Sequence, residues 1–595
     1  MDKLNRTLGV NRQLDGTYEF RVWAPHAKNV TVEIINSREN KLFPMTAEED
    51  GYFYLKTAEV SAGNRYYYHL DKGRYADPAA DYQPEGPAGP SEIVDFPLEI
   101  STLNRPFSTY IIYELHVGTF SEDGTFAGVI PHLDELQALG ITAIEIMPVA
   151  QFSGARNWGY DGVLPYAVQN TYGGPLGLKE LVAACHQRGL AVILDVVYNH
   201  IGPEYNYLEQ FGDYFTDKYH TPWGKALNFD DRNCHHVRRY FIENALHWFQ
   251  HYGIDALRLD ALHAIVDDSA YPFLEQLSDA VKALGKAHNH EFYLIAESSA
   301  NDTRLIRSKS QGGFALNAQW NDEFHHALHT LLTGEQHSYY QDYGHLHHFA
   351  KAYAQGYVYS GDYSKFRNRP HGVSSKNIPA RQFIVFMQNH DQIGNRPWGD
   401  RLSTHLDERQ IRLYLALLLF SPYIPMIYMG EEYAETAPFL YFTSHDSEEL
   451  NRLVYEGRSR EFSFIGDHLP NPHDEAVFKK SVLNHTLKKE EKHARIWSYC
   501  QEAIRLRTTH PVLSTLTKKG MKVRQHHGLL FIHRQHQNEA IEMIVNISPH
   551  PVPARSQWIK PSWFLTWDSN PEDYDKDTIA PFTLLLYTRR LNHDE

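Results

Sequence analysis

Four short apolar segments in the middle of the chain each end in acidic or histidine residues. These ends are Asp195-Val-Val-Tyr-Asn-His200, Arg258-Leu-Asp260, Glu297 and Asn389-His-Asp391. Apolar runs such as residues 190–194 and 383–387 are typical of strands that are buried on both faces of a parallel sheet. In a barrel of parallel strands the carboxyl ends meet on one rim, where barrel active sites lie. The pattern therefore predicts an active site on the rim of an α/β barrel.

The rest of the middle region supports a barrel through its alternation of strands and amphipathic helices. Strands are expected at residues 111–115, 141–148, 190–197, 256–259 and 292–296, and helices at 129–139, 178–188, 237–251 and 493–508. Alternation of this length favours a central (β/α)8 TIM barrel over a doubly wound sheet, although periodicity alone does not separate the two.

The length of 595 residues predicts more than one domain, because single cores stop growing at roughly 250 to 300 residues. Residues 1–100 contain short alternating strands, at 17–23, 30–35 and 65–70, and predict an N-terminal β-sandwich. Residues 76–91, rich in Pro and Gly, are expected to form a connector on a surface. The barrel is assigned to 101–510 with an excursion near 439–489, and strands at 529–533, 541–546 and 582–587 predict a C-terminal β-sandwich over 511–595.

Composition excludes several classes of partner. The formal charge is −16, from 57 basic and 73 acidic residues, which argues against nucleic acid and favours a neutral substrate. The N-terminal residues lack a signal-peptide core, and no stretch reaches the ~20 apolar residues of a membrane helix. The three cysteines, Cys185, Cys234 and Cys500, suit buried free thiols better than a disulfide framework. We therefore expect a cytoplasmic protein without a membrane partner.

Two carboxyl groups at the strand ends have the environments that acid and nucleophile need. Arg258 and Asp260 are two residues apart on a strand, so their side chains share one face. The guanidinium keeps the carboxylate ionised, as a nucleophile or charge stabiliser requires. Glu297 closes an apolar strand, where desolvation raises the pKa of a carboxyl toward that of a proton donor.

Other polar residues at the same ends would surround a sugar. Asp391 could hydrogen-bond hydroxyls and stabilise positive charge at the anomeric carbon, and His200 and His263 could hold hydroxyls of the same ring. The alternative for Asp195, Arg258 and Asp391 is a set of structural ion pairs, but four such ends in register argue against it. The His-rich run at 345–349 suits a random cluster among 36 histidines, so we assign no metal and no cofactor.

In order and content, the four strand ends resemble the signature regions of the α-amylase superfamily, glycoside hydrolase family 13, and residues 140–149 look like its second barrel strand. The resemblance implies Asp260 as nucleophile, Glu297 as acid/base and Asp391 as transition-state stabiliser, with retention through a glycosyl-enzyme. Retention requires the two reacting carboxyls to lie about 5 to 5.5 Å apart. The resemblance also implies that Tyr160 stacks on the sugar. The further substrate contacts that it implies are Trp158, Asp195, His200, Arg258, His263 and His390.

Within that superfamily, four further segments are similar to the malto-oligosyltrehalose trehalohydrolase family: residues 76–91, 223–229, 318–327 and 359–372. The similarity implies a starch-binding-like first domain and a maltooligosaccharide-type substrate. It implies hydrolysis of the α-1,4 bond between a maltooligosyl chain and trehalose, a step of trehalose biosynthesis. It also implies a functional pairing with a maltooligosyl trehalose synthase.

Selection of trehalose needs hydrogen bonds on the leaving-group side that a linear maltosyl unit cannot copy. Candidates lie in residues 319–326 and 359–369, and we name Trp223, Asp322 and Glu323 as expected contacts. The alternative is that these segments pack the barrel rim. Leu262, where many α-amylases carry Lys, argues against endo-amylase specificity and against their calcium site.

Three rival functions remain at this point: a 1,4-α-glucan branching transferase, a general α-amylase and a non-catalytic glucan-binding protein. His263 favours hydrolysis over branching, because branching enzymes generally lack it. A non-catalytic protein on the same fold would need at least one lost carboxylate. Here Asp260, Glu297 and Asp391 are all present.

Overall fold

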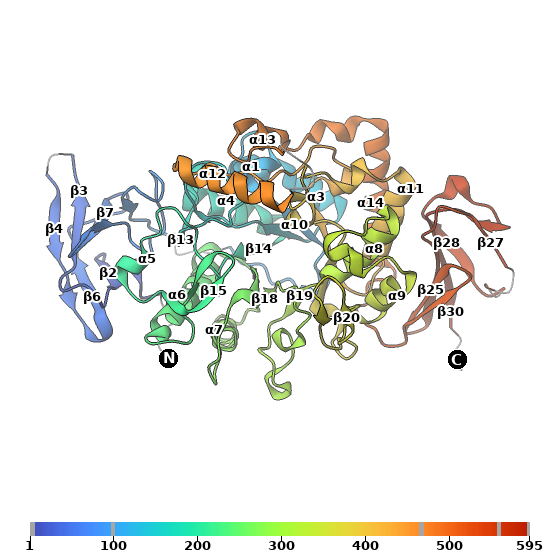
Figure 1. The fold of residues 1–595 in the computed structure, drawn as a ribbon, viewed down its shortest axis with the longest axis horizontal. Coiled ribbons are helices and arrows are strands. Elements are labelled where there is room, and N and C mark those ends of the chain that lie inside the picture. The colour runs from blue at the N-terminus through green and yellow to red at the C-terminus, as the bar shows by residue number, and fades with distance from the viewer. Residues whose placement is uncertain are drawn as a thin grey trace.

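The computed structural model describes residues 6–37, 39–96, 101–462, 469–555, 558 and 561–591. Figure 1 shows three parts in a row, with a barrel in the middle, a small β domain at the N-terminal end and another at the C-terminal end. The predicted boundary at residue 100 and residues 463–468 of the predicted excursion lie outside the described residues. The limits of the three domains stay a prediction.

The middle part is a closed barrel of eight parallel strands in the order β10-β11-β14-β17-β18-β19-β22-β23. Pairing of β10 with β23 closes it, which confirms the barrel and excludes the doubly wound sheet. The strands are β10 (Ile112–Leu115), β11 (Ala143–Ile146), β14 (Ala191–Val196), β17 (Ala256–Leu259), β18 (Tyr293–Ala296), β19 (Ala318–Trp320), β22 (Phe383–Phe386) and β23 (Ile424–Tyr428).

Helices surround the barrel close to where periodicity placed them. They include α4 (Gly174–Gln187), α6 (Cys234–His247), α7 (Phe273–His288), α8 (Asp322–Thr333), α11 (Glu408–Leu419) and α14 (Glu491–Thr509). The helix predicted at 129–139 is divided into α2 (Phe126–Val129), a 3-10 turn (Ile130–His132) and α3 (Leu133–Leu139). Pro131 causes the division, because it has no N–H to continue the helical ladder. No helix of the described residues is long and apolar enough to cross a membrane.

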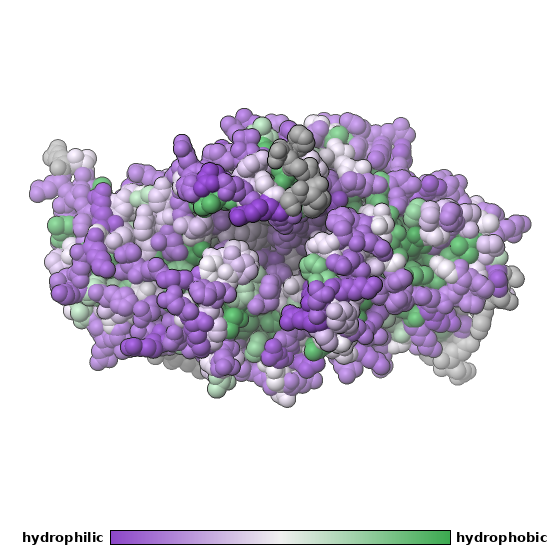
Figure 2. All heavy atoms as spheres, in the orientation of Figure 1, coloured by the Kyte–Doolittle hydropathy of each residue, from purple (hydrophilic) through white to green (hydrophobic). Residues whose placement is uncertain are grey.

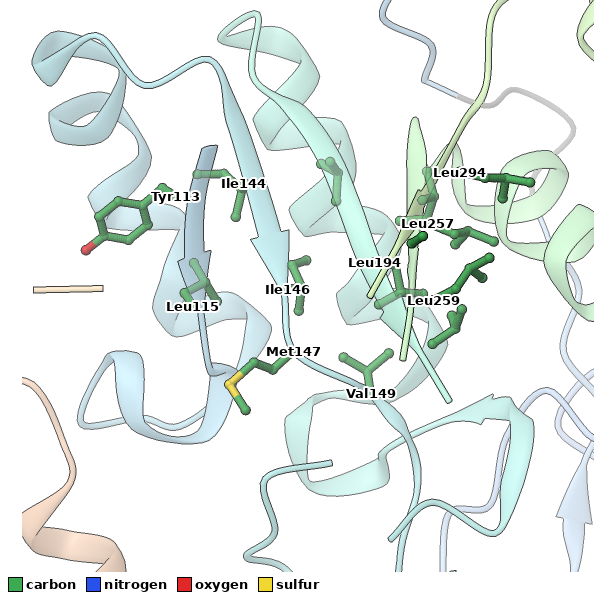
Figure 3. Close-up of a cluster of buried hydrophobic side chains, with 14 of the residues drawn as sticks. Tyr113, Leu115, Ile144, Ile146, Met147, Val149, Leu194, Leu257, Leu259 and Leu294 are labelled. Carbon is green, nitrogen blue, oxygen red and sulfur yellow. The ribbon is translucent and has the colours of Figure 1, made fainter. Parts of the chain in front are cut away.

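Alternation along the strands divides their side chains between two layers. Figure 3 shows the outer layer, where Tyr113, Ile144, Leu194 and Leu257 are among the side chains of neighbouring strands that pack together. The inner layer begins as a separate apolar cluster at the strand starts, formed by residues such as Ile112, Ala143, Ala191, Ala256 and Ile295. Two residues further along several strands the inner positions are charged. The barrel therefore has an apolar floor and an ionic upper half.

The N-terminal domain is the predicted β-sandwich. One sheet has the order β1-β2-β6-β5 and the other contains β4-β3-β7-β8, with β9 also paired to β7. The strands are β1 (Gly9–Arg12), β2 (Tyr18–Trp23), β3 (Thr31–Ile35), β4 (Lys41–Pro44), β5 (Thr46–Ala47), β6 (Tyr52–Thr57), β7 (Arg65–Leu70), β8 (Gly73–Tyr75) and β9 (Ser91–Glu92).

The connector at 76–91 is more buried than expected. Asp77 and Gln83 are fully buried, and the carbonyl of Pro78 accepts a hydrogen bond of 2.6 Å from Tyr240 on the barrel helix α6. Arg6 pairs with Asp81 of the connector in the same interior. Pro and Gly were correct signals of irregular structure, but this segment lies between the first domain and the barrel and joins them.

The C-terminal domain is built on a five-stranded sheet of order β24-β25-β26-β30-β28, with a two-stranded sheet of β27 and β29 beside it. Ile579 of β29 packs in one cluster with Leu529, Phe531 and Leu585 of the larger sheet. The strands are β24 (Lys522–His526), β25 (Leu529–His536), β26 (Glu539–Asn546), β27 (Val552–Pro553), β28 (Phe564–Asp568), β29 (Thr578–Ile579) and β30 (Thr583–Arg590).

Arg534 of β25 joins the C-terminal domain to the barrel. Its guanidinium is 2 % exposed and donates to the carbonyls of Phe420 at 2.7 Å, Val512 at 2.9 Å and Thr515 at 2.7 Å. Buried carbonyls that lose their donors cost free energy, because they cannot return to water. Arg534 is therefore a main stabiliser of this interface.

We predict that Arg534→Met lowers the thermal unfolding midpoint of the C-terminal domain, with a cost of about 3 kcal/mol from unsatisfied carbonyls. Arg524→Met is the matched control, because Arg524 of β24 is largely exposed and its buried partner Glu542 keeps a second contact with His533. Calorimetry of both variants checks the prediction, and equal midpoints would contradict it.

Candidate active site

Arg258 of β17 lies where the polar strand ends meet. Its guanidinium is fully buried, and Nη1 donates to both oxygens of Asp195, at 3.0 and 2.9 Å, and to Oδ1 of Asp260 at 2.7 Å. Its Nη2 lies 3.7 Å from Oε2 of Glu297. The ring of Trp320 lies against its other side, 4.3 Å from the central carbon. One cation therefore fixes carboxyl groups from three neighbouring strand ends.

The backbone after β17 and β18 places the two reacting carboxyls of the predicted mechanism. The barrel ladder continues past the strands, because Asp260 N donates to Val196 O and Glu297 N donates to Leu259 O, both at 3.1 Å. Ala261 then takes a left-handed φ of 41°, and its N–H donates to Oε2 of Glu297 at 2.7 Å. This strained turn fixes one Glu297 oxygen beside the loop that carries Asp260.

The electrostatics of Glu297 and Asp391 are opposed, as an acid and a charge stabiliser need. Burial raises the pKa of Glu297, and Asp260 raises it further against the lowering effect of Arg258. Burial alone would raise the pKa of Asp391, but His390 and Arg258 outweigh it and lower that pKa to about 2. Glu297 therefore keeps a proton to higher pH than an ordinary glutamate, whereas Asp391 stays an anion.

His390 connects Asp391 to the charged layer of the barrel. Its Nδ1 bonds Glu114 of β10, its backbone N–H donates to the same carboxylate at 3.2 Å, and its Nε2 lies 3.4 Å from Asp391. Burial alone would lower the pKa of His390, but the charges of Asp391 and Glu114 raise it well above the usual range. His390 is thus an imidazolium, and both ring nitrogens donate.

Tyr160 completes the network on the other side. Its hydroxyl donates to Asp195 at 2.7 Å and lies 2.7 Å from Nε2 of His390, while its ring stacks on that imidazole at 5.0 Å. Burial and Asp195 raise the pKa of Tyr160 well above the usual range, so the hydroxyl keeps its proton. The ring is half-buried. Tyr160 is thus held in one orientation at the mouth of the barrel.

The structure places two of the expected contacts beneath the site. Trp158 is buried, stacks on Phe439 at 5.1 Å and donates to the carbonyl of Leu440. Asp195 is buried under Tyr160 and Arg258. Both are better described as supports for other side chains than as direct contacts with a substrate.

His200, Trp223 and His263 are at the rim. The rings of His200 and Trp223 stack at 4.7 Å and 5°, and Trp223 is 47 % exposed in the hairpin of β15 (Phe215–Thr221) and β16 (Gly224–Leu227). His263 is exposed in a 3-10 turn after Asp260 (Leu262–Ala264). Trp223 and His263 are thus open to a bound sugar, whereas His200 is buried and its Nε2 lies 2.9 Å from the carbonyl oxygen of Tyr160.

Asp322 and Glu323, adjacent at the start of α8, differ in environment. Burial, together with the nearby carboxyls of Glu297 and Asp391, raises the pKa of Asp322 to about 7. Glu323 is buried and accepts hydrogen bonds from the hydroxyl of Tyr343 and the backbone N–H groups of residues 358 and 359. Its carboxylate thus anchors the segment at 358–359, and the expected substrate contact at Glu323 stays a prediction.

Three residues close to the site were missed from the sequence: Glu114, Glu145 and Trp320. The two glutamates lie inside apolar strands, Ile-Tyr-Glu-Leu and Ala-Ile-Glu-Ile, where an isolated charged residue was itself the signal. Trp320 belongs to β19, which has three residues and was not predicted as a strand.

Figure 2 shows the surface hollowed near the middle of the view, over the position of α10 (His390–Gly394), with mainly hydrophilic side chains around it.

A parallel barrel whose rim holds an Arg-fixed aspartate, a raised-pKa glutamate and a third aspartate defines an α-amylase-type glycosidase. Sequence comparison agrees, since the α-amylase catalytic domain matches residues 115–225 and carbohydrate-binding module 48, the isoamylase N-terminal domain, matches residues 7–82. The resemblance to the superfamily is confirmed.

Comparison with individual proteins identifies the family within this superfamily. Malto-oligosyltrehalose trehalohydrolases from Saccharolobus solfataricus and Arthrobacter ramosus are 45% and 41% identical, over 80% and 83% of this chain and 83% and 87% of theirs. The chain belongs to the malto-oligosyltrehalose trehalohydrolase family. A 1,4-alpha-glucan branching enzyme of Bacillus caldolyticus is only 27% identical, over 73% of this chain and 67% of its own.

Among solved structures, a putative alpha amylase from Salmonella typhimurium is similar over the whole chain, with a TM-score of 0.90 and 34% identity, covering 99% of this chain and 100% of that one. A pullulanase from Anoxybacillus complexed with maltotetraose shares the fold, with a TM-score of 0.73 and 18% identity over 98% of this chain and 88% of its own.

We predict that Glu297→Gln lowers turnover of an unactivated glucoside by about 10²- to 10⁴-fold, because proton transfer to the leaving group is lost. A substrate with an activated leaving group needs no proton, so steady-state rates should show a much smaller loss with it. Glu291→Gln is the matched control, since Glu291 is exposed and lies just before the other end of β18. Equal losses on both substrates would instead indicate a structural role for Glu297.

Proposed function

We propose that this chain is a retaining glycosidase that cleaves the α-1,4 bond between a maltooligosyl chain and the trehalose unit of maltooligosyl trehalose, with release of trehalose. Membership of the trehalohydrolase family supports the substrate and the reaction. The observation that carries the mechanism is the shared guanidinium of Arg258, which fixes Asp260 and stands beside Glu297.

In the first step a carboxylate oxygen of Asp260 attacks the anomeric carbon of the maltooligosyl unit. The bond from that carbon to the glycosidic oxygen breaks, and Glu297 transfers its proton to this oxygen, so that trehalose leaves as a neutral sugar. The raised pKa of Glu297 supports its role as donor. The Asp391 carboxylate stabilises the positive charge that develops at the anomeric carbon.

In the second step the deprotonated Glu297 takes a proton from water, and the water oxygen attacks the anomeric carbon. The bond to Asp260 breaks, and a maltooligosaccharide with the original α configuration leaves. Two inversions account for retention. Tyr160, held by Asp195 and His390, offers its ring to the sugar at the cleavage point.

The leaving-group side is where trehalose must be distinguished from a linear maltosyl unit. We place Asp322 and the exposed Trp223 there as contacts, together with His263. Asp322 lies near the acid, because Glu297 is among the groups that, with burial, raise its pKa to about 7. A protonated carboxyl can both donate and accept, which suits a pair of sugar hydroxyls.

A cytoplasmic location and a functional pairing with a maltooligosyl trehalose synthase belong to the same proposal. The three cysteines are free thiols, as a reducing compartment allows, although Cys234 is half-buried where full burial was expected. A synthase is the class of enzyme that would supply the substrate. The absence of a metal or cofactor stays a prediction.

The test of the substrate is product analysis by chromatography after separate incubation with maltotriosyl trehalose and maltopentaose. We expect free trehalose from the first and little cleavage of the second, because a linear maltosyl unit cannot copy the hydrogen bonds that trehalose makes on the leaving-group side. Rapid cleavage of both would indicate a general amylase. Transfer of chain segments without release of sugar would indicate a branching enzyme.

The test of the nucleophile is Asp260→Asn, which removes the attacking carboxylate and keeps its size. We expect turnover of maltotriosyl trehalose to fall by at least about 10⁴-fold, since the covalent route is lost. Asp268→Asn is the control, because Asp268 is exposed on the following loop. Retained activity in the folded Asp260→Asn protein, as judged by circular dichroism, would exclude Asp260 as nucleophile.

A further inference from the structure

Glu145 is a buried carboxyl that the mechanism above does not use. It lies on the inner face of β11, in register with Glu114 of β10 and Ile193 of β14. Its exposed fraction is 1 %, and neither of its carboxyl oxygens has a hydrogen-bond partner among the described residues. An ionised carboxylate in such a place is unfavourable in free energy, because no hydrogen-bond donor replaces the water molecules that it has lost.

The charged groups that face Glu145 come from four elements. They are Glu114 of β10, Asp195 of β14, Arg258 of β17 and His390 of α10. Burial raises the pKa of Glu145 well above its usual range; Glu114 and Asp195 raise it further, and the two cations lower it. Burial without a hydrogen-bond partner therefore favours the neutral acid form of Glu145.

Both neighbouring cations are already shared with carboxylates of the active site. Nη1 of Arg258 donates to Asp260, while its Nε and Nη2 have no hydrogen-bond partner among the described residues. His390 is attracted to Asp391, with Nε2 3.4 Å away. A further anion in this low-dielectric interior would compete with these carboxylates for the same two cations.

We propose that Glu145 is a positioning residue that acts through Arg258 and His390. As a neutral acid it leaves Arg258 on Asp260 and His390 beside Asp391. As an anion it draws both cations toward β11 and disables the site, so that its ionisation adds to the loss of the Glu297 proton on the alkaline side of the activity profile. This inference rests on the proposed roles of Asp260 and Asp391.

The test compares Glu145→Gln, Glu145→Ala and the control Glu431→Gln. Gln has the shape of the neutral acid and cannot ionise. On the acid side of the pH profile Glu145→Gln should therefore lose less than about threefold in kcat. Glu145→Ala should lose more than about tenfold, because it leaves a cavity. Above neutral pH, the fall of kcat should move to higher pH in Glu145→Gln. The rates are measured with maltotriosyl trehalose.

The control separates a local effect from a general effect of buried acids. Glu431 is buried, and burial raises its pKa to about 7, but the groups that lower this pKa are Gln388, Tyr414 and the backbone N–H of Tyr428, which carry no charge. Between the ordinary pKa of a glutamate and the raised pKa of Glu145 or Glu431, the folded protein holds a proton that the unfolded chain has lost. The free energy of unfolding of the wild type therefore falls as pH rises through this range. Both Gln variants should therefore gain in unfolding temperature above neutral pH, and only Glu145→Gln should shift the kcat profile.

An infrared measurement tests the neutral acid without reference to activity. The difference spectrum of wild type minus Glu145→Gln should contain a carboxylic acid C=O band at neutral pH that disappears in alkali. A missing band would overturn the proposal even if the catalytic roles hold. With the band present, superimposed kcat profiles, or a Gln variant as inactive as the Ala variant, would overturn it as well. Failure of the catalytic roles would instead show as retained activity in Asp260→Asn.

Discussion

The active site depends on the burial of one guanidinium. Arg258 is surrounded by carboxyl groups from neighbouring strands and covered on one side by Trp320. A buried ion pair is a poor stabiliser, since desolvation offsets most of the attraction, but loss of one partner is costly. The arrangement thus tolerates little change. In return the carboxyl groups are held at fixed places in a water-poor space, where each charge acts strongly on its neighbours.

The alternation of side chains along the barrel strands explains how Arg258 is held inside the barrel. Inward positions near the strand starts are apolar, and the charged layer is placed two residues higher, on the same faces of the same strands. The charges are numerous there, yet few are free: Glu114 is bound by His390, and Asp195 by Arg258 and Tyr160. Protons on some carboxyls and cations beside others keep the layer close to balance.

Much of the barrel and of its active site could be predicted from the sequence, because strand ends are short local signals. The pair of Arg258 with Asp260 was visible from spacing, and the apolar runs before the strand ends indicated parallel strands. The contacts of Glu323 could not be predicted, because they depend on a loop more than thirty residues away in the chain. The burial of the 76–91 connector was missed for a similar reason, since Pro and Gly indicate irregular backbone and carry no information about what packs against it.

That buried connector has a mechanical consequence. A binding module on a flexible linker searches a volume, and its benefit to the catalytic domain is an effective concentration set by linker length. Here Tyr240 of the barrel binds the connector and Arg6 closes on Asp81, so the module has no such freedom. It is a fixed wall of the enzyme, and any glucan held on it would lie at one distance and one angle from the barrel mouth.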